Sequence, residues 1–127
     1  YKYRNRVRTM KIKNMLNSFK YAFTGIKSAF QSERNMKIHV AAMVLVIILG
    51  LVLKLTIVEW IICFICFAMV ISAELFNTAI ELTVDLAMPK KNENAKKAKD
   101  IAAGGVLVCA IASLIIGILI FLPKIIE

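Results

Sequence analysis

The sequence predicts an all-α membrane protein, with an N-terminal amphipathic surface helix followed by three transmembrane helices. Hydrophobic residues make up 60% of the 127 positions and the mean hydropathy is +0.75, whereas a soluble domain has about 45–50% apolar residues. The formal net charge is +9, and the basic residues gather before position 38 and between positions 89 and 100. Long apolar stretches separate these basic zones. The composition therefore excludes an intrinsically disordered chain and argues against a soluble globular domain.

Two segments precede the apolar stretches. Residues 1–13 are rich in Lys and Arg, and we expect them to form a basic arm near anionic lipid headgroups. In residues 14–32, apolar side chains recur at steps of three and four, which is the spacing of one helix face. The stripe consists of Leu16, Phe19, Phe23, Ile26 and Phe30. An aromatic-rich stripe accompanied by lysines predicts a helix in the cytoplasmic membrane interface; the alternative, a helix covering a soluble core, finds no such core in this sequence.

Residues 33–127 form the predicted transmembrane domain. A spanning helix needs about 20 mostly apolar residues, and the apolar pattern places three spans at about 38–57, 58–88 and 101–122. The third span carries no charge, and we expect Pro123 to end it. The first reaches spanning length only if the Lys54 side chain extends to the membrane surface.

The distribution of basic residues predicts the orientation. Lys and Arg are concentrated before the first span and in a loop at 89–100, so the positive-inside rule places both in the cytoplasm. Three spans then put the C-terminus outside. No small-residue cleavage site follows the basic N-terminal stretch, so we expect no cleavable signal peptide.

Polar residues on the second span are the most informative feature. Glu74, Asn77, Glu81 and Asp85 are spaced by three, four and four, and fall within roughly 80° of one helix face. A carboxylate inside a bilayer costs several kcal/mol and usually has a function. Counting from Trp60 places Glu74 about 8 Å inside the cytoplasmic boundary. The alternative is carboxylates paired with basic residues for packing, which explains one such residue more readily than three.

Other charged residues are expected at the same membrane level. Glu33 precedes the first span, and Lys99 and Asp100 precede the third. Carboxylates with a lysine suit a site for Mg²⁺ and phosphate, because the oxygens hold the metal and the lysine neutralises the phosphate.

The third span indicates self-association. Small residues occur on one side of it, at Ala102, Gly105, Cys109, Ser113 and Gly117. Small residues let membrane helices approach closely, so we expect a homo-oligomer in which neighbouring helices cover the acidic face.

The remaining patterns are better explained by structure. Cys63 and Cys66 lie in an apolar stretch, as does Cys109, and we interpret all three as packing residues. We assign His39, at the entrance to the first span, no special role. The chain has no GxxxxGK[ST] phosphate loop and no recognised nucleic-acid-binding module, so nucleic acid is not an expected partner.

Two motifs together resemble a known family. The run from Glu74 through Asn77 and Glu81 to Asp85, followed by Ala98-Lys99-Asp100, is similar to the signature of the small bacterial membrane kinases of diacylglycerol and undecaprenol. The resemblance extends from about residue 14 to residue 122. Glu33-Arg34-Asn35 and the ending Phe121-Leu122-Pro123-Lys124 are more like the undecaprenol kinase branch.

The resemblance implies a homotrimer in the bacterial inner membrane, with active sites between subunits that transfer the γ-phosphoryl group of Mg-ATP to a lipid hydroxyl. It makes Glu74 the catalytic base and gives the metal to Glu33 and Glu81. Those two residues would also contact the nucleotide, together with Tyr21, Lys99 and Asp100. Supporting or lipid-contacting roles would fall to Asn77, Lys27, Ser28 and Asp85. Two departures from the family pattern stand out: Asn14 replaces an Arg for which Lys11 or Lys13 could substitute, and the loop Lys90-Lys91-Asn92 differs from the diacylglycerol kinases.

Three alternatives to an undecaprenol kinase remain. The chain could phosphorylate diacylglycerol instead. It could be a small proton- or cation-coupled transporter, since an intramembrane Glu also occurs in proton relays, although its carboxylates cluster at the membrane edge rather than at the midplane. It could also be an inactive homologue, against which the complete motif argues.

Overall fold

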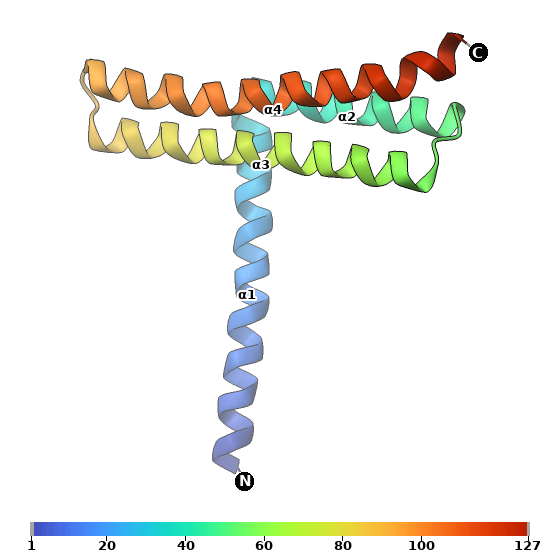
Figure 1. Cartoon of the computed structure of the whole chain (residues 1–127). Coiled ribbons are helices and arrows are strands. Elements are labelled where there is room, and N and C mark those ends of the chain that lie inside the picture. Colours follow the sequence, from blue (N-terminus) through green and yellow to red (C-terminus); the bar gives the residue numbers. More distant parts are fainter. Residues whose placement is uncertain (1, 127) are drawn as a thin grey trace. The chain divides into compact units, whose positions relative to one another are not determined.

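The protein is helical throughout its described part. The computed structural model describes the backbone of residues 2–126 and the side chains of residues 10–126. The helices are α1 (Lys2–Ser32), α2 (Arg34–Val52), α3 (Ile57–Ala87) and α4 (Glu93–Ile126), and the described backbone contains no strand (Figure 1). They form two units, one ending at Ser32 and the other beginning at Glu33. The first unit is the single helix α1, which begins at Lys2 rather than near Asn14; most side chains of the predicted basic arm lie outside the described residues.

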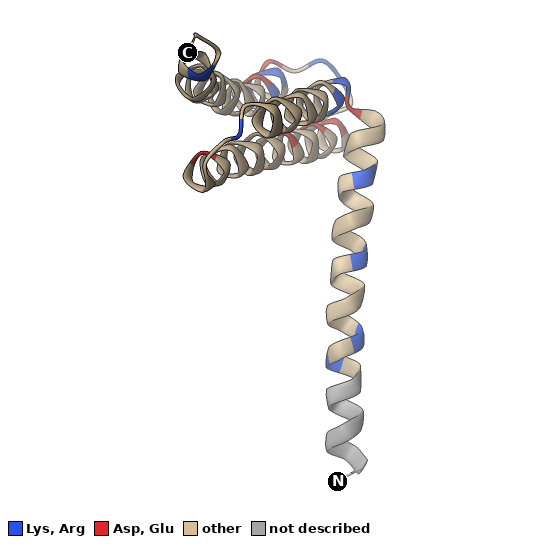
Figure 2. Ribbon diagram, turned by 90° about the vertical axis from the view of Figure 1, so that its right-hand side faces the viewer, with Lys and Arg blue, Asp and Glu red and all other residues tan. Residues whose placement is uncertain are grey.

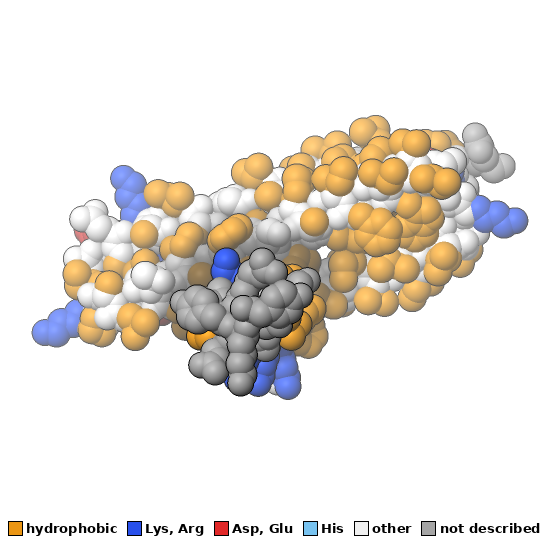
Figure 3. All heavy atoms as spheres, turned by 90° about the horizontal axis from the view of Figure 1, so that it is seen from below, with side chains coloured by type: hydrophobic (Ala, Val, Ile, Leu, Met, Phe, Trp, Pro, Cys, Tyr) orange, Lys and Arg blue, Asp and Glu red, His pale blue; other side chains and the backbone are white. Residues whose placement is uncertain are grey.

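The second unit is a bundle of three long helices. α3 and α4 form an antiparallel hairpin packed along its length, and α2 packs against α3 (Figure 1). All three are long and apolar enough to cross a membrane, which agrees with the three predicted spans. Hydrophobic side chains cover the face of this unit seen in Figure 3, and lysines lie at its two ends. Such a surface suits lipid rather than water.

The turn between α2 and α3 corrects the predicted boundary at residue 57. α2 ends at Val52, and Lys54 adopts a φ of 53° that few non-glycine residues tolerate. The Thr56 hydroxyl accepts a hydrogen bond from the Glu59 amide, and the Glu59 carboxylate accepts one from the Thr56 amide at 2.7 Å. This capping box starts α3 because it satisfies amides that have no helical partner.

The predicted loop at 89–100 is also corrected. The Asn92 side-chain oxygen accepts hydrogen bonds from the amides of Asn94 and Ala95, so α4 begins at Glu93 and residues 93–100 are helical. Asn is a favoured N-cap residue, just before a helix, because its side-chain oxygen accepts hydrogen bonds from the first free amides of the helix.

At the other end, Pro123 does not end α4 as predicted, because it lies inside a helix that extends to Ile126. Proline lacks the amide that would bond one turn back, and the end of α4 bends away from the hairpin in Figure 1.

The apolar core lies beside the α2–α3 turn. Leu55, Cys63 and Phe121 are buried there, and Trp60 and Phe67 pack against them. The Lys124 ammonium binds the Glu59 carboxylate at 3.1 Å, which joins the end of α4 to the start of α3. The polar residues of the acidic stripe lie toward the opposite end of the hairpin, so the apolar core and the buried polar residues occupy different parts of the unit.

Candidate active site

Glu74 is the most deeply buried charged side chain in the described part of the chain. Only 2% of it is exposed, and its Oε2 atom has no hydrogen-bond partner among the described residues. The nearby Thr78 hydroxyl donates to the Glu74 carbonyl oxygen at 2.9 Å and not to the carboxylate. A buried polar atom without a partner carries a substantial free-energy cost. Glu74 is therefore a side chain whose surroundings favour binding a group from outside the chain.

Burial decreases along the predicted stripe. Asn77 is buried, and its amide nitrogen donates to the Glu81 carboxylate at 3.2 Å while its Oδ1 atom has no partner among the described residues. Glu81 is half-buried and Asp85 is exposed. The polar residues of α3 therefore become more exposed along the helix, from Glu74 to Asp85.

The start of α2 contributes to the same neighbourhood. Glu33 is the N-cap residue of α2, and His39 lies on the same helix. Both interact electrostatically with Glu74, as does Glu81. Glu33 and Glu81 therefore both lie within electrostatic range of Glu74. The structure adds His39, which the sequence analysis left without a role, because its position near Glu74 depends on the packing of α2 against α3.

The start of α4 contributes lysines next to the exposed end of the acidic stripe. The Lys99 ammonium binds the Asp85 carboxylate at 2.5 Å, and Lys96 binds Asp100 at 2.6 Å. Lys99 therefore joins the acidic stripe, whereas Asp100 pairs within α4 on an exposed surface. Lys96, to which the sequence analysis gave no special role, is the partner of a predicted nucleotide residue.

A basic hollow lies between the end of α3 and the start of α4. Its volume is about 640 Å³, and four lysines line it together with two carboxylates, Asp85 and Glu93. The lysines are Lys90, Lys91, Lys96 and Lys99. The hollow is large enough for a small ligand, and its charge favours an anionic one.

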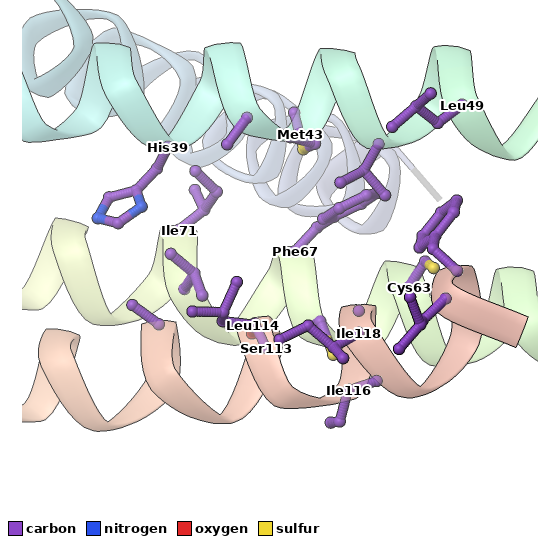
Figure 4. A pocket seen from close by; sticks show the side chains of 18 of the residues that line it. His39, Met43, Leu49, Cys63, Phe67, Ile71, Ser113, Leu114, Ile116 and Ile118 are labelled. Atoms are coloured by element: carbon purple, nitrogen blue, oxygen red, sulfur yellow. The ribbon is translucent and has the colours of Figure 1, made fainter. Parts of the chain in front are cut away.

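An apolar cavity of about 530 Å³ lies between α2 and the α3–α4 hairpin (Figure 4). His39 lies at one end, and Leu49 and Cys63 lie at the other. Ser113 and Gly117, two members of the small-residue side of α4, line it. Because His39 borders the cavity and also interacts with Glu74, the apolar space and the polar stripe meet at this residue.

The remaining predicted residues belong to α1. Tyr21, Lys27 and Ser28 are exposed side chains of that helix. The unit that contains Glu74 begins at Glu33 and does not include them.

The donor set fits a metal that arrives with a phosphate ligand. In residues 10–126, no three His, Cys, Asp or Glu side chains converge as a metal cluster would require. Mg²⁺ in phosphate-transfer sites commonly takes only one or two carboxylates and completes its shell with phosphate oxygens and water. Glu81, which accepts a hydrogen bond from Asn77, and Glu33 both interact electrostatically with Glu74 and are the two carboxylates that would hold such a metal.

Comparison with known proteins identifies the family. The model for prokaryotic diacylglycerol kinase matches residues 20–121. The chain is 48% identical to undecaprenol kinase of Bacillus subtilis over 89% of its own length and 92% of that protein. It is 40% identical to a diacylglycerol kinase of Synechocystis, covering 90% of the chain and 66% of that protein. It is 30% identical to a diacylglycerol kinase of Haemophilus influenzae, covering 90% of the chain and 98% of that protein.

The matched region includes the acidic stripe, the start of α4 and all three apolar helices. These relatives are all named as kinases of a lipid alcohol. A buried carboxylate and a nearby basic hollow suit the transfer of a phosphoryl group to such an alcohol. The chain therefore belongs to the prokaryotic diacylglycerol kinase family and is a lipid kinase of the bacterial membrane.

Proposed function

We propose that this protein transfers the γ-phosphoryl group of Mg-ATP to the hydroxyl of undecaprenol at the cytoplasmic membrane surface. The observation that carries the proposal is the Glu74 carboxylate, which is buried on an apolar helix and has an oxygen without a partner in the described chain. A lipid hydroxyl that remains in the membrane can meet this oxygen without leaving the apolar phase. The choice of lipid is supported by the 48% identity to the Bacillus subtilis undecaprenol kinase.

In this proposal Glu74 is the catalytic base. It accepts the proton of the lipid hydroxyl while the hydroxyl oxygen forms a bond to the γ-phosphorus and the bond to the ADP leaving group breaks. Glu33 and Glu81 would hold the metal, which neutralises phosphate charge when bound. Asn77 positions Glu81 through the hydrogen bond described above.

The nucleotide is assigned to the polar end of the hairpin. Lys99 would bind a phosphate in place of Asp85, its present partner. Asp100 and Tyr21 are proposed nucleotide contacts, and Lys27, Ser28 and Asp85 are proposed supporting or lipid-contacting residues. The four lysines of the basic hollow make this end attractive to a polyphosphate.

The proposal includes a membrane arrangement. α1 lies in the cytoplasmic interface, the N-terminus is cytoplasmic and the C-terminus is outside, as the distribution of Lys and Arg favours. Three subunits assemble, and active sites form between them. The exposed positions Gly105 and Ile101 on α4 leave room for a neighbouring helix.

A competition assay tests the substrate. Purified protein in mixed micelles receives radiolabelled Mg-ATP with equimolar undecaprenol and diacylglycerol, and the two lipid products are separated and counted. We expect undecaprenyl phosphate to exceed phosphatidate by at least about tenfold, which is about 1.4 kcal/mol of discrimination. A preference for diacylglycerol would replace the proposed substrate with the second candidate, which the relatives from Synechocystis and Haemophilus favour.

The transporter alternative is tested separately. Proteoliposomes with an imposed pH or cation gradient should show no flux above protein-free vesicles when ATP is absent. Flux without ATP that the Glu74→Gln change removes would contradict the kinase proposal.

A further inference from the structure

Three lysines of α1 are spaced by seven residues, at Lys13, Lys20 and Lys27. Seven residues of a helix return to within about 20° of the starting direction, so the three side chains form one row about 21 Å long. In Figure 2 blue segments recur along one side of α1, and a further one, next to the grey part, lies on the other side. All three lysines are exposed. We refer to these three residues as the lysine row.

The lysine row borders an apolar stripe. Phe19 and Phe23 are 59% and 69% exposed, and they lie near the centre of that stripe. At about 100° per residue, the row lies some 60–100° around α1 from this centre. The row is therefore placed where side chains leave an apolar surface and enter a polar one.

The charge of α1 has a single sign. Positions 1–32 contain no Asp or Glu, so no carboxylate of the helix neutralises the row. A helix exposed to water commonly mixes both signs, because opposite charges three or four residues apart stabilise it. α1 has no such pairs, which indicates that its counter-charges come from outside the helix.

Chain connectivity joins α1 directly to a helix that is apolar enough to span a membrane. Only Glu33 separates the end of α1 at Ser32 from the start of the apolar helix α2 at Arg34. With the apolar stripe facing the bilayer, flanking lysines reach the level of the lipid phosphates. We infer that the lysine row binds the headgroups of anionic phospholipids in the cytoplasmic leaflet, and that these lipids fix α1 on the membrane surface.

The inference rests on the interfacial placement of α1 in the proposed function, and it adds the lipid class to which the helix responds. A lysine near an anionic surface changes partitioning about fivefold, so the row contributes on the order of a hundredfold. Phosphatidylcholine carries its own cation and offers no such gain.

Hydrogen–deuterium exchange tests this on the whole protein. The full chain is placed in nanodiscs of phosphatidylcholine alone or with one third phosphatidylglycerol, and exchange is followed at the amides of residues 10–30. We expect slower exchange with phosphatidylglycerol, by tens of fold or more. Raising the ionic strength from about 0.05 M to about 0.5 M should remove most of the difference, because the screening length falls below about 5 Å.

Charge-matched variants locate the effect. Replacing the row by glutamine (K13Q/K20Q/K27Q) should abolish the response to phosphatidylglycerol, whereas K90Q/K91Q/K97Q, with the same loss of charge on exposed positions outside α1, should retain it. Equal responses of the two triple variants would overturn the inference, as would equal exchange of the wild type in both lipids.

Two further outcomes separate the inference from its premises. Rapid exchange of α1 in every bilayer would remove the interfacial placement itself, while the lipid assay above would still decide the kinase proposal. Amide exchange in α1 could instead be slowed by a few per cent of a lipid monophosphate and not by phosphatidylglycerol. The lysine row would then bind a phosphorylated product, which would contradict the assignment to bulk phospholipid. The salt titration needs only the wild-type chain, so the test does not depend on the variants folding.

Discussion

Glu74 and Glu81 lie two turns apart on α3 in different surroundings. Glu74 is almost fully buried and keeps an oxygen without a partner in the described chain, whereas Glu81 is half-buried and accepts a hydrogen bond from Asn77. This difference supports the different roles proposed above, in which Glu74 would meet the lipid hydroxyl and Glu81 would meet the metal and phosphate.

This difference predicts distinct effects of two isosteric changes. Glu74→Gln should lower the phosphorylation rate by about 10²–10⁴-fold, because it removes the proton acceptor, and should leave Mg-nucleotide affinity nearly unchanged. Glu81→Gln should weaken Mg-nucleotide binding by about tenfold or more. Calorimetric titration with a non-hydrolysable nucleotide, beside the lipid assay, measures both effects. Full nucleotide binding by both variants would contradict the assigned roles.

The sequence predicted the acidic residues of the site because their spacing on one helix can be read directly. It missed His39, whose proximity to Glu74 depends on how α2 packs against α3. It also missed Thr78, a buried hydroxyl that bonds to the backbone one turn back. Residue spacing within a helix does not reveal contacts between helices.

At the scale of the elements, the cap of α3 depends on one hydroxyl. Thr56→Ala should destabilise the bundle by about 1 kcal/mol, because it leaves the Glu59 amide without its acceptor. Thermal unfolding in detergent should show a midpoint lowered by a few degrees. Thr83→Ala is the matched control, since the Thr83 hydroxyl donates to the Ala79 carbonyl on an exposed face and caps nothing. An equal loss in both variants would refute the role of the cap.

Gly50 allows α2 and α3 to approach closely at the same turn. A Cβ atom added there would lie 2.8 Å from the Trp60 ring. Gly50→Ala should therefore cost about 1–3 kcal/mol, despite the better helix propensity of alanine. In the double change with Trp60→Leu, the added cost of the alanine should disappear. Gly25→Ala, whose Cβ meets no atom within 4 Å, is the control. A neutral Gly50→Ala in the unfolding assay would show that the contact is unimportant.

The helices were predictable from hydropathy, but their ends were not. The sequence placed the first boundary at residue 57 because apolar residues continue through the turn, and the capping box Thr56-x-x-Glu59 was the overlooked signal. Asn92 likewise marked the start of α4. Pro123 was read as an end, although the last turn of a helix can continue beyond a proline. Hydropathy indicates which residues lie in the membrane, whereas capping hydrogen bonds determine the residue at which a helix begins.

At the scale of the whole molecule, the small residues of α4 divide into two groups. Ser113 and Gly117 line the cavity inside the chain, whereas Gly105 does not line it and is exposed. The part of the small-residue side nearest Lys99 therefore remains available for a neighbouring subunit.

The proposed trimer makes this position sensitive. Gly105→Leu should shift the protein toward monomers in native mass spectrometry, while the far-ultraviolet circular dichroism stays unchanged. Ala103→Leu, on an exposed position pointing elsewhere around α4, should not affect assembly. A Gly105→Leu protein that remains trimeric would exclude this surface as the contact between subunits.

The ion pair between Glu59 and Lys124 has a mechanical consequence. The α3–α4 hairpin is closed by the chain at residues 88–92 and by this pair at its other end, so the two helices form a frame that resists splaying. α2 is joined to the frame by a short turn at one end, and among the described helices it packs mainly against α3. A change in the width of the apolar cavity would therefore require α2 to move relative to the hairpin. Such a movement would shift His39 and Glu33, whereas Glu74, Glu81 and Lys99 would keep their positions relative to one another.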